Sequence, residues 1–263
     1  MAKQSAAAGD LRHDLVGAIE RGELRLEFQP IVRLGGGTVV GAEALVRWRH
    51  PQRGTIAPND FLPAAEEAGL LDGIGDFVLD QAARAAAGWP RSADRPGFVS
   101  VNCAPSQLGT TGAATRMLGL IEAAGLAARL LTIELTGGVT GEATVTNLNL
   151  SELRDAGVRI ALDDFGNATS LADLKRLPVD QVKLAREFVA AINGPAQEQA
   201  FALSLINLAE VRGAEVVAKG VESREQAWRL AELGCRYGQG FFFSKPLGAS
   251  GVLAVLRQGT LRG

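Results

Sequence analysis

Short apolar runs alternate with longer amphipathic segments along this chain, and that alternation predicts its fold class. Eight runs have the length and composition of strands, namely 24–32, 39–48, 98–104, 130–136, 158–164, 179–185, 214–221 and 237–244. Between most of them lie Ala- and Leu-rich stretches with helical spacing, such as 77–89, 145–156, 187–212 and 224–233. The first two runs are joined directly by the turn sequence LGGGT, which predicts a hairpin. Strands that alternate with helical crossovers in about 250 residues match a closed β/α barrel.

An open, doubly wound α/β sheet is the alternative architecture. It usually carries a glycine-rich first turn of the form G-x-G-x-x-G, and this chain has none. No P-loop pattern and no repeat of solenoid length is present either. We therefore expect one barrel domain over residues 11–263, preceded by a loose N-terminal tail over residues 1–10.

Composition and charge narrow the class of protein. The 27 Lys and Arg residues against 29 Asp and Glu residues give a formal net charge of -2, so no bulk positive field attracts duplex nucleic acid. No 18-residue apolar span and no apolar segment of signal-peptide length is present, which predicts a cytoplasmic protein without a membrane span. Cys103 and Cys235 stand far apart in apolar or turn contexts and are expected as buried free thiols.

The tract RIALDDFG, residues 159–166, carries the sharpest chemical signal. It is an apolar run that ends in two adjacent carboxylates, Asp163 and Asp164, followed closely by a glycine. Ionised carboxylates beside apolar surroundings need a cation, hydrogen bonds or water to compensate them. A divalent metal ion is the sharpest candidate, and the alternative is that Asp164 caps the next helix or starts a turn.

Other polar residues stand at or near the carboxyl ends of the predicted strands, where the working residues of β/α barrels project. Strand after strand contributes an acid, an amide or a lysine: Glu43, Asn102, Glu134, Asp163, Asp164, Lys183, Glu222 and Gln239. Oxygen ligands from several strands are what Mg²⁺ or Mn²⁺ prefers. The set therefore indicates a divalent-metal site at the mouth of the barrel.

These residues also carry a family resemblance. The stretch EALVRWRHP, residues 43–51, occurs together with QPI, VN, IELT, ALDDFG, LKRLPVD, VK, GVES and QGFFFSKP in order between residues 24 and 246. The set resembles the EAL domain family, whose members bind or hydrolyse the bacterial second messenger cyclic di-GMP in signal transduction. The resemblance implies a modified TIM-type (β/α)8 barrel in which the first strand runs antiparallel to the others.

The resemblance also implies a role for each matching position. The first metal ion, Mg²⁺ or Mn²⁺, would be held by the residues Glu43, Asn102, Glu134 and Asp163. A second would lie between Asp163, Asp164 and an acid on the seventh strand, and the two ions would activate the attacking water. Lys183 would contact this water and the phosphate, which makes Lys183, Asp164 and Gln239 the candidate catalytic residues. The dinucleotide would be lined by Gln29, Leu45, Arg47, Glu222 and Gln239.

Three acids of the family pattern are replaced in this chain. Lys219 stands where the seventh-strand acid is expected, Gly137 follows the fourth-strand motif, and Ala185 follows Lys183 two residues later. The loop DFGNATSL is also one residue shorter than the family pattern and lacks its tyrosine. If Lys219 points into the site, its ammonium competes with the second metal ion for Asp163 and Asp164, and if it points to solvent the site is merely one ligand short.

The departures favour a catalytically impaired EAL domain that binds cyclic di-GMP as a receptor, with one metal site retained and the second lost. A metal-dependent phosphodiesterase that opens cyclic di-GMP to pGpG is the first alternative, supported by the intact first-metal set. A scaffold that works through an unidentified protein partner without nucleotide is the second. A homodimer is expected by analogy with the family.

Overall fold

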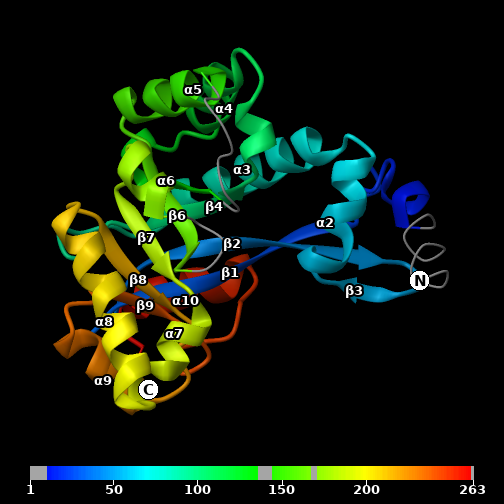
Figure 1. The fold of residues 1–263 in the computed structure, drawn as a ribbon. Coiled ribbons are helices and arrows are strands. Elements are labelled where there is room, and N and C mark those ends of the chain that lie inside the picture. The colour runs from blue at the N-terminus through cyan, green and yellow to red at the C-terminus, as the bar shows by residue number, and fades with distance from the viewer. Residues whose placement is uncertain (1–10, 136–143, 167–170, 262–263) are drawn as a thin grey trace, which may run out of the picture.

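The structure is a computed structural model that describes residues 11–135, 144–166 and 171–261. Within these ranges eight strands close into a barrel, shown in Figure 1: β1 (Leu24–Arg33), β2 (Thr38–His50), β4 (Phe98–Cys103), β5 (Leu131–Leu135), β6 (Arg159–Phe165), β7 (Gln181–Leu184), β8 (Glu215–Lys219) and β9 (Tyr237–Gln239). The strand order is β1-β9-β8-β7-β6-β5-β4-β2, and β1 pairs with β2 to close the ring. β1 runs antiparallel to both neighbours while the other strands around the ring are parallel. The closed barrel and its antiparallel first strand are therefore confirmed.

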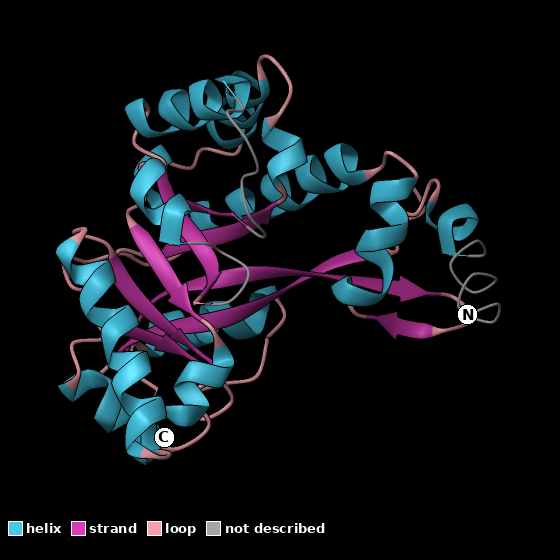
Figure 2. Ribbon diagram, in the orientation of Figure 1, coloured by secondary structure: helices cyan, strands magenta, loops and turns pink. Residues whose placement is uncertain are grey.

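Helices cover the outside of the barrel, as Figure 2 shows. They are α2 (Pro58–Glu67), α3 (Leu71–Ala87), α4 (Ala113–Ala123), α5 (Thr144–Asp155), α6 (Leu171–Arg176), α7 (Arg186–Ala190), α8 (Ala196–Val211), α9 (Arg224–Glu232) and α10 (Ala249–Gln258), with 3₁₀ turns η1 (Pro105–Leu108), η2 (Ala128–Leu130) and η3 (Ala191–Asn193). Over the described part of the chain, none of these helices has the length and apolar character needed to cross a membrane. The tail predicted over residues 1–10 lies outside the described residues.

The ribbon of β1 and β2 continues beyond the barrel and carries a further strand, β3 (Gly54–Ile56), beside α2 (Figure 1). The end of β2 is fixed there by Trp48, which is fully buried and packs edge-on against Phe61 of α2. The indole N–H of Trp48 donates to the Glu23 carboxylate at 3.0 Å. This extension anchors the strand that brings the EALVR segment to the mouth of the barrel.

Two elements differ from the prediction, one because it ends early and the other because it is divided. The strand predicted to run to residue 244 stops at Gln239, because Gly240 lies against the backbone of Val221, where a Cβ would meet the Val221 carbonyl oxygen at 2.1 Å. The chain then turns, with the Ser244 amide donating to the Gly240 carbonyl. The helix predicted over 187–212 is divided into α7, η3 and α8, and Gly194 and Pro195 separate η3 from α8, since proline lacks the N–H that a continuous helix needs.

The apolar core has two parts of different size. The larger fills the space between strands and helices, and the smaller lies inside the barrel around Ile31, Phe98 and Val217. Below the smaller cluster, at the amino-terminal end of the strands, the Glu215 carboxylate accepts hydrogen bonds from Arg159 and Arg236. An apolar layer thus separates the polar groups at one end of the barrel interior from those at the other end, and it isolates the charges at the mouth.

Candidate functional site

The strand register brings the predicted polar residues to one face of the sheet. Gln29 lies opposite Glu43 across β1 and β2, and Asn102 lies opposite Glu134 across β4 and β5. Residues paired across neighbouring strands point to the same face, which here is the inside of the barrel. The carboxyl ends of the parallel strands therefore gather their side chains at a single mouth.

Lys183 is the centre of this group. It comes from β7, its side chain is 1% exposed, and its ammonium donates to Glu43 Oε2 at 2.6 Å and to both Glu134 carboxylate oxygens at 2.7 and 2.8 Å. Burial alone would lower the pKa of Lys183, but the charges of Glu134 and Glu43 outweigh it and raise that pKa. Lys183 is therefore a permanent cation that holds two buried carboxylates together.

Amide groups complete the hydrogen bonding of Glu43. Asn102 Nδ2 donates to Glu43 Oε1 at 2.8 Å, and Gln239 Nε2 donates to Glu43 Oε2 at 2.6 Å. The same Gln239 nitrogen lies 3.4 Å from Gln29 Oε1, while the buried Gln239 Oε1 finds no partner among the described residues. Six predicted site residues thus form one connected network around Lys183.

The pKa values of the two glutamates in the network shift in opposite directions. Burial pushes the pKa of Glu43 upward, but the Lys183 ammonium and the amides of Gln239 and Asn102 outweigh it and lower that pKa to about 2. Burial and the neighbouring Glu43 carboxylate raise the pKa of Glu134 to about 7. The ionised form is therefore favoured at Glu43, whereas burial beside a second carboxylate makes it costly at Glu134.

Asp163 and Asp164 owe their arrangement to a β-bulge. The β6–β7 pairing shifts register after Leu162, so that both aspartates lie against the single residue Lys183 of β7. Asp164 has a φ of +46°, in the left-handed region that non-glycine residues seldom adopt. Adjacent residues of a regular strand point to opposite faces, and the bulge instead lets both carboxylates reach one cation, Lys219.

That cation comes from β8 and reaches across β7. Lys219 Nζ lies 2.7 Å from Asp163 Oδ1 and 2.7 Å from Asp164 Oδ1. Burial would lower the pKa of Lys219, but the Asp163 carboxylate outweighs it and raises that pKa. The Lys219 side chain therefore points into the site and not to solvent.

The remaining predicted ligand-lining residues lie at the rim. Leu45 and Arg47 follow Glu43 at two-residue intervals along β2 and are half-buried. The Arg47 guanidinium donates from Nε to Glu27 Oε2 at 2.9 Å, and Glu222 is exposed just after β8. None of the hydrogen bonds formed within residues 11–135, 144–166 and 171–261 joins Leu45, Arg47 or Glu222 to the Lys183 network. Sequence reasoning missed Glu27, although its spacing of two from Gln29 places it on the same face of β1.

Comparison with known proteins now decides the family. The family model for the EAL domain matches residues 12–246. This chain belongs to the EAL domain family. This chain is 41% identical over 239 residues to the uncharacterized protein Rv1357c of Mycobacterium tuberculosis, and the match covers 88% of this chain and 77% of that protein.

Two further relatives have a named activity or ligand. The cyclic di-GMP phosphodiesterase NbdA of Pseudomonas aeruginosa is 36% identical over 253 residues, which cover 94% of this EAL domain chain but only 32% of NbdA. The solved structure of the PaMucR phosphodiesterase in its c-di-GMP complex is 35% identical, with a TM-score of 0.85 and coverage of 92% of this chain and 99% of that one. The chain thus spans about a third of NbdA and nearly all of the PaMucR chain.

Two of the three positions that depart from the family pattern lie in the described part of this chain. Lys219 pairs with Asp163 and Asp164. Ala185 is buried between β7 and α7, where it provides no side-chain cap for the helix. A carboxylate at position 185 would accept from the free amides of the first turn of α7. Gly137 and the shortened loop at 167–170 lie outside the described residues.

The net charge of the side chains at the mouth bears on whether a divalent ion can bind there. Glu43, Glu134, Asp163 and Asp164 give four carboxylates when ionised, and two lysine ammoniums, from Lys183 and from the Lys219 position, reduce the net charge to -2. Within the described ranges no three or more His, Cys, Asp or Glu residues are grouped so that they could hold a metal ion. Here Lys183 pairs with Glu43 and Glu134, and Lys219 pairs with Asp163 and Asp164. The donors are oxygen and amide groups and the net charge is negative, which is compatible with binding of a hard divalent ion.

Proposed function

We propose that this EAL domain binds cyclic di-GMP as a receptor and that its phosphodiester hydrolysis is impaired. The observation that carries the proposal is the Lys219 ammonium, which lies 2.7 Å from both Asp163 and Asp164. The relatives support the ligand class, because NbdA is a cyclic di-GMP phosphodiesterase and the PaMucR structure is a c-di-GMP complex.

Different residues at the mouth would contact different parts of the ligand. The Arg47 guanidinium can grip a phosphate or a guanine edge through its planar fork, and the Gln29 amide and the Glu222 carboxylate can complete a polar rim with Leu45 as an apolar wall. Lys219 places a positive charge where it can neutralise a phosphate. A divalent ion at Glu43, Asn102, Glu134 and Asp163 would supply polarisation of a phosphate oxygen when bound.

Hydrolysis needs more than this arrangement offers. Two-metal phosphodiester cleavage uses one ion beside the attacking oxygen and the other beside the leaving oxygen. An ammonium at the second position donates hydrogen bonds and cannot activate a water by coordination. Loss of one electrostatic stabiliser commonly costs about 10²- to 10³-fold in rate, and Ala185 and Gly137 remove further acids. Turnover should therefore fall well below an enzyme-like rate.

A metal-dependent phosphodiesterase that releases pGpG is the second candidate. It is favoured by the convergence of Glu43, Asn102, Glu134 and Asp163 with Lys183, the residues that the family resemblance associates with the first metal ion and the reacting phosphate. The two candidates share the ligand and differ only in turnover. One experiment can therefore separate them.

The test combines calorimetry with product analysis. Cyclic di-GMP is titrated into the protein in Mg²⁺, Mn²⁺ or EDTA, and the same mixtures are analysed by chromatography for pGpG. We expect saturable binding with little product, and weaker binding by Arg47→Ala but not by Arg257→Ala, an exposed arginine of α10. Rapid pGpG formation would overturn the receptor proposal, and an absence of binding in all three conditions would favour a nucleotide-independent scaffold.

A further inference from the structure

The amino-terminal end of the barrel, opposite the mouth, brings three arginines together. β1 runs antiparallel to its neighbours, so its last residue, Arg33, lies beside Tyr237, the first residue of β9. Arg159 is the first residue of β6, and Arg236 directly precedes β9. An apolar layer separates this end from the mouth. The three arginines therefore form a charged group that is independent of the Lys183 network.

One carboxylate, that of Glu215 at the start of β8, pairs with two of these arginines. One Glu215 oxygen accepts from Arg159 and the other accepts from Arg236. The Gln181 amide lies 3.3 Å from the first of these oxygens, and the Tyr237 hydroxyl lies 3.5 Å from the second. Each Glu215 oxygen is thus shared between two donors, so this carboxylate has little capacity left for a third arginine.

The third arginine, Arg33, forms no ion pair with any residue in the described part of the chain. It donates to the backbone carbonyl of Asp94 at 3.4 Å, which leaves most of its five N–H donors for another acceptor. Its guanidinium lies 5.7 Å from the centre of the Tyr237 ring, and the Arg236 guanidinium lies 5.4 Å from the same centre. Three guanidiniums against one carboxylate leave a net charge of +2, and like charges this close repel each other unless an anion or water compensates them.

We propose that this end of the barrel binds a doubly charged phosphate group between Arg33, Arg159 and Arg236. Guanidiniums present planar pairs of N–H donors that match phosphate oxygens, and a phosphate dianion balances a charge of +2, whereas a carboxylate balances only half of it. The arginines are within reach of a ligand, since Arg33 is half-buried and the side chains of Arg159 and Arg236 are 30% and 52% exposed. Glu215 already holds two of the guanidiniums in place, which lowers the cost of ordering them when the ligand binds.

Titration calorimetry in EDTA at constant ionic strength tests this site. In EDTA the mouth keeps its net charge of -2 and repels phosphate, so binding reports on the opposite end. Inorganic phosphate and guanosine 5′-monophosphate are titrated separately, because the phosphate group can be the free ion or the end of a phosphomonoester. The wild-type protein should bind one phosphate group per chain, and Arg33→Gln should raise its Kd by about tenfold or more.

Arg49→Gln is the matched control, because Arg49 is an exposed arginine on the part of β2 that extends beyond the barrel. It should leave the phosphate Kd unchanged, and circular dichroism checks that each variant is folded. Binding of inorganic phosphate alone would identify the free ion as the ligand, and tighter binding of the nucleotide would identify a phosphomonoester. A wild-type protein that binds neither probe, or an equal loss in Arg49→Gln, would overturn the proposal.

A second substitution changes the charge of the site in the opposite direction. Glu215→Gln removes the carboxylate that competes with phosphate for Arg159 and Arg236, so it should lower the phosphate Kd several-fold. A phosphate Kd that is the same in Glu215→Gln, Arg33→Gln and the wild-type protein would show that phosphate binds elsewhere. Arg47→Ala at the mouth should weaken cyclic di-GMP binding and leave the phosphate Kd unchanged. Failure of the proposed function and failure of this second site are therefore distinguishable.

Discussion

Lys219→Glu is the substitution that examines the site most directly. In the wild-type protein its ammonium holds Asp163, whose side chain is 9% exposed, and Asp164, whose side chain is 56% exposed. Removing one partner of a buried ion pair costs about 3–5 kcal/mol, and the exposure of Asp164 places this case near the lower end. The metal-free variant should therefore unfold with about 3 kcal/mol less free energy, which lowers Tm by about 6–12 °C at the 2–4 °C per kcal/mol expected for a domain of this size.

Divalent ions should reverse much of that loss. The change from lysine to glutamate takes the net charge of the four acids and two side-chain positions from -2 to -4, which two divalent ions balance. A ligand at 100 times its Kd stabilises the folded state by about 2.7 kcal/mol. Thermal unfolding in EDTA and in Mg²⁺ measures this stabilisation, and titration calorimetry counts the ions. We expect one ion in the wild-type protein and two in the variant.

Lys219→Met provides the matched control. It has a side chain of similar length without the charge, so it should lose the ion-pair stability yet bind no second ion. Turnover should stay low in Lys219→Glu, because Gly137, Ala185 and the shortened loop remain unchanged. Equal ion counts in the wild-type and glutamate proteins would refute the assignment of the second position, and rapid pGpG release by the single variant would show that the loop matters less than argued.

Three further predictions concern other buried groups. Lys183→Met should destabilise the protein by about 3–5 kcal/mol at neutral pH in denaturant unfolding, because it leaves two buried carboxylates without their cation. Glu215→Gln should cost about 2 kcal/mol at pH 7. The pKa of Glu215 is lowered, since the hydrogen bond and charge of Arg159 and the charge of Arg236 outweigh burial, so its contribution is present above the unfolded pKa and the two stability curves should converge as the pH falls below about 4. Burial raises the pKa of each cysteine thiol to about 12, so iodoacetamide at pH 8 should label them only after unfolding, the thiolate fraction being about 10⁻⁴.

Much of the fold could be predicted because strand runs and helical spacing are local signals. The departures arose where a glycine or a proline decided the backbone path. The apolar run after Gln239 reads as strand, but Gly240 must lie on the Val221 backbone and the chain turns there. The long helical pattern after residue 187 crosses Gly194 and Pro195, a dipeptide that marks a break more reliably than apolar spacing marks continuity.

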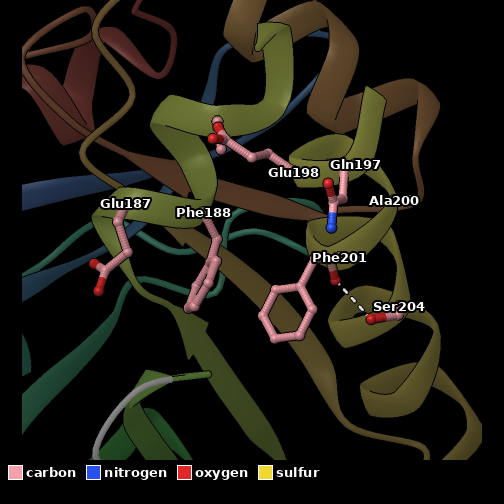
Figure 3. A pocket seen from close by; sticks show the side chains of 8 residues that line it. Glu187, Phe188, Gln197, Glu198, Ala200, Phe201 and Ser204 are labelled. Carbon is pink, nitrogen blue, oxygen red and sulfur yellow. Dashed lines mark hydrogen bonds between the residues drawn. The ribbon is translucent and has the colours of Figure 1, made fainter. Parts of the chain in front are cut away.

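The site could be predicted only in part for a different reason. Residues such as Glu43, Asn102 and Glu134 follow from the rule that the carboxyl ends of parallel strands meet at one mouth. Strand alternation alone would send Asp163 and Asp164 to opposite faces, and the bulge that unites them has no signal in the sequence. An open groove between α7 and α8, lined by Phe188 and Phe201 (Figure 3), was also not predicted, because helical spacing marks apolar residues as core and does not reveal where the helices leave them uncovered.

In the proposed function, the pairing of Lys219 separates recognition from catalysis at this mouth. A metal ion between Asp163 and Asp164 would dissociate and would accept further oxygen ligands, whereas the lysine is covalently attached and lies 2.7 Å from each carboxylate. It can satisfy the two acids and donate its third N–H to a phosphate oxygen, so the positive charge needed for an anionic ligand is retained. It offers no coordination position at which a water could lose its proton near neutral pH. Under the proposed function, a lysine at position 219 therefore preserves the electrostatics of binding while it removes one source of the nucleophile.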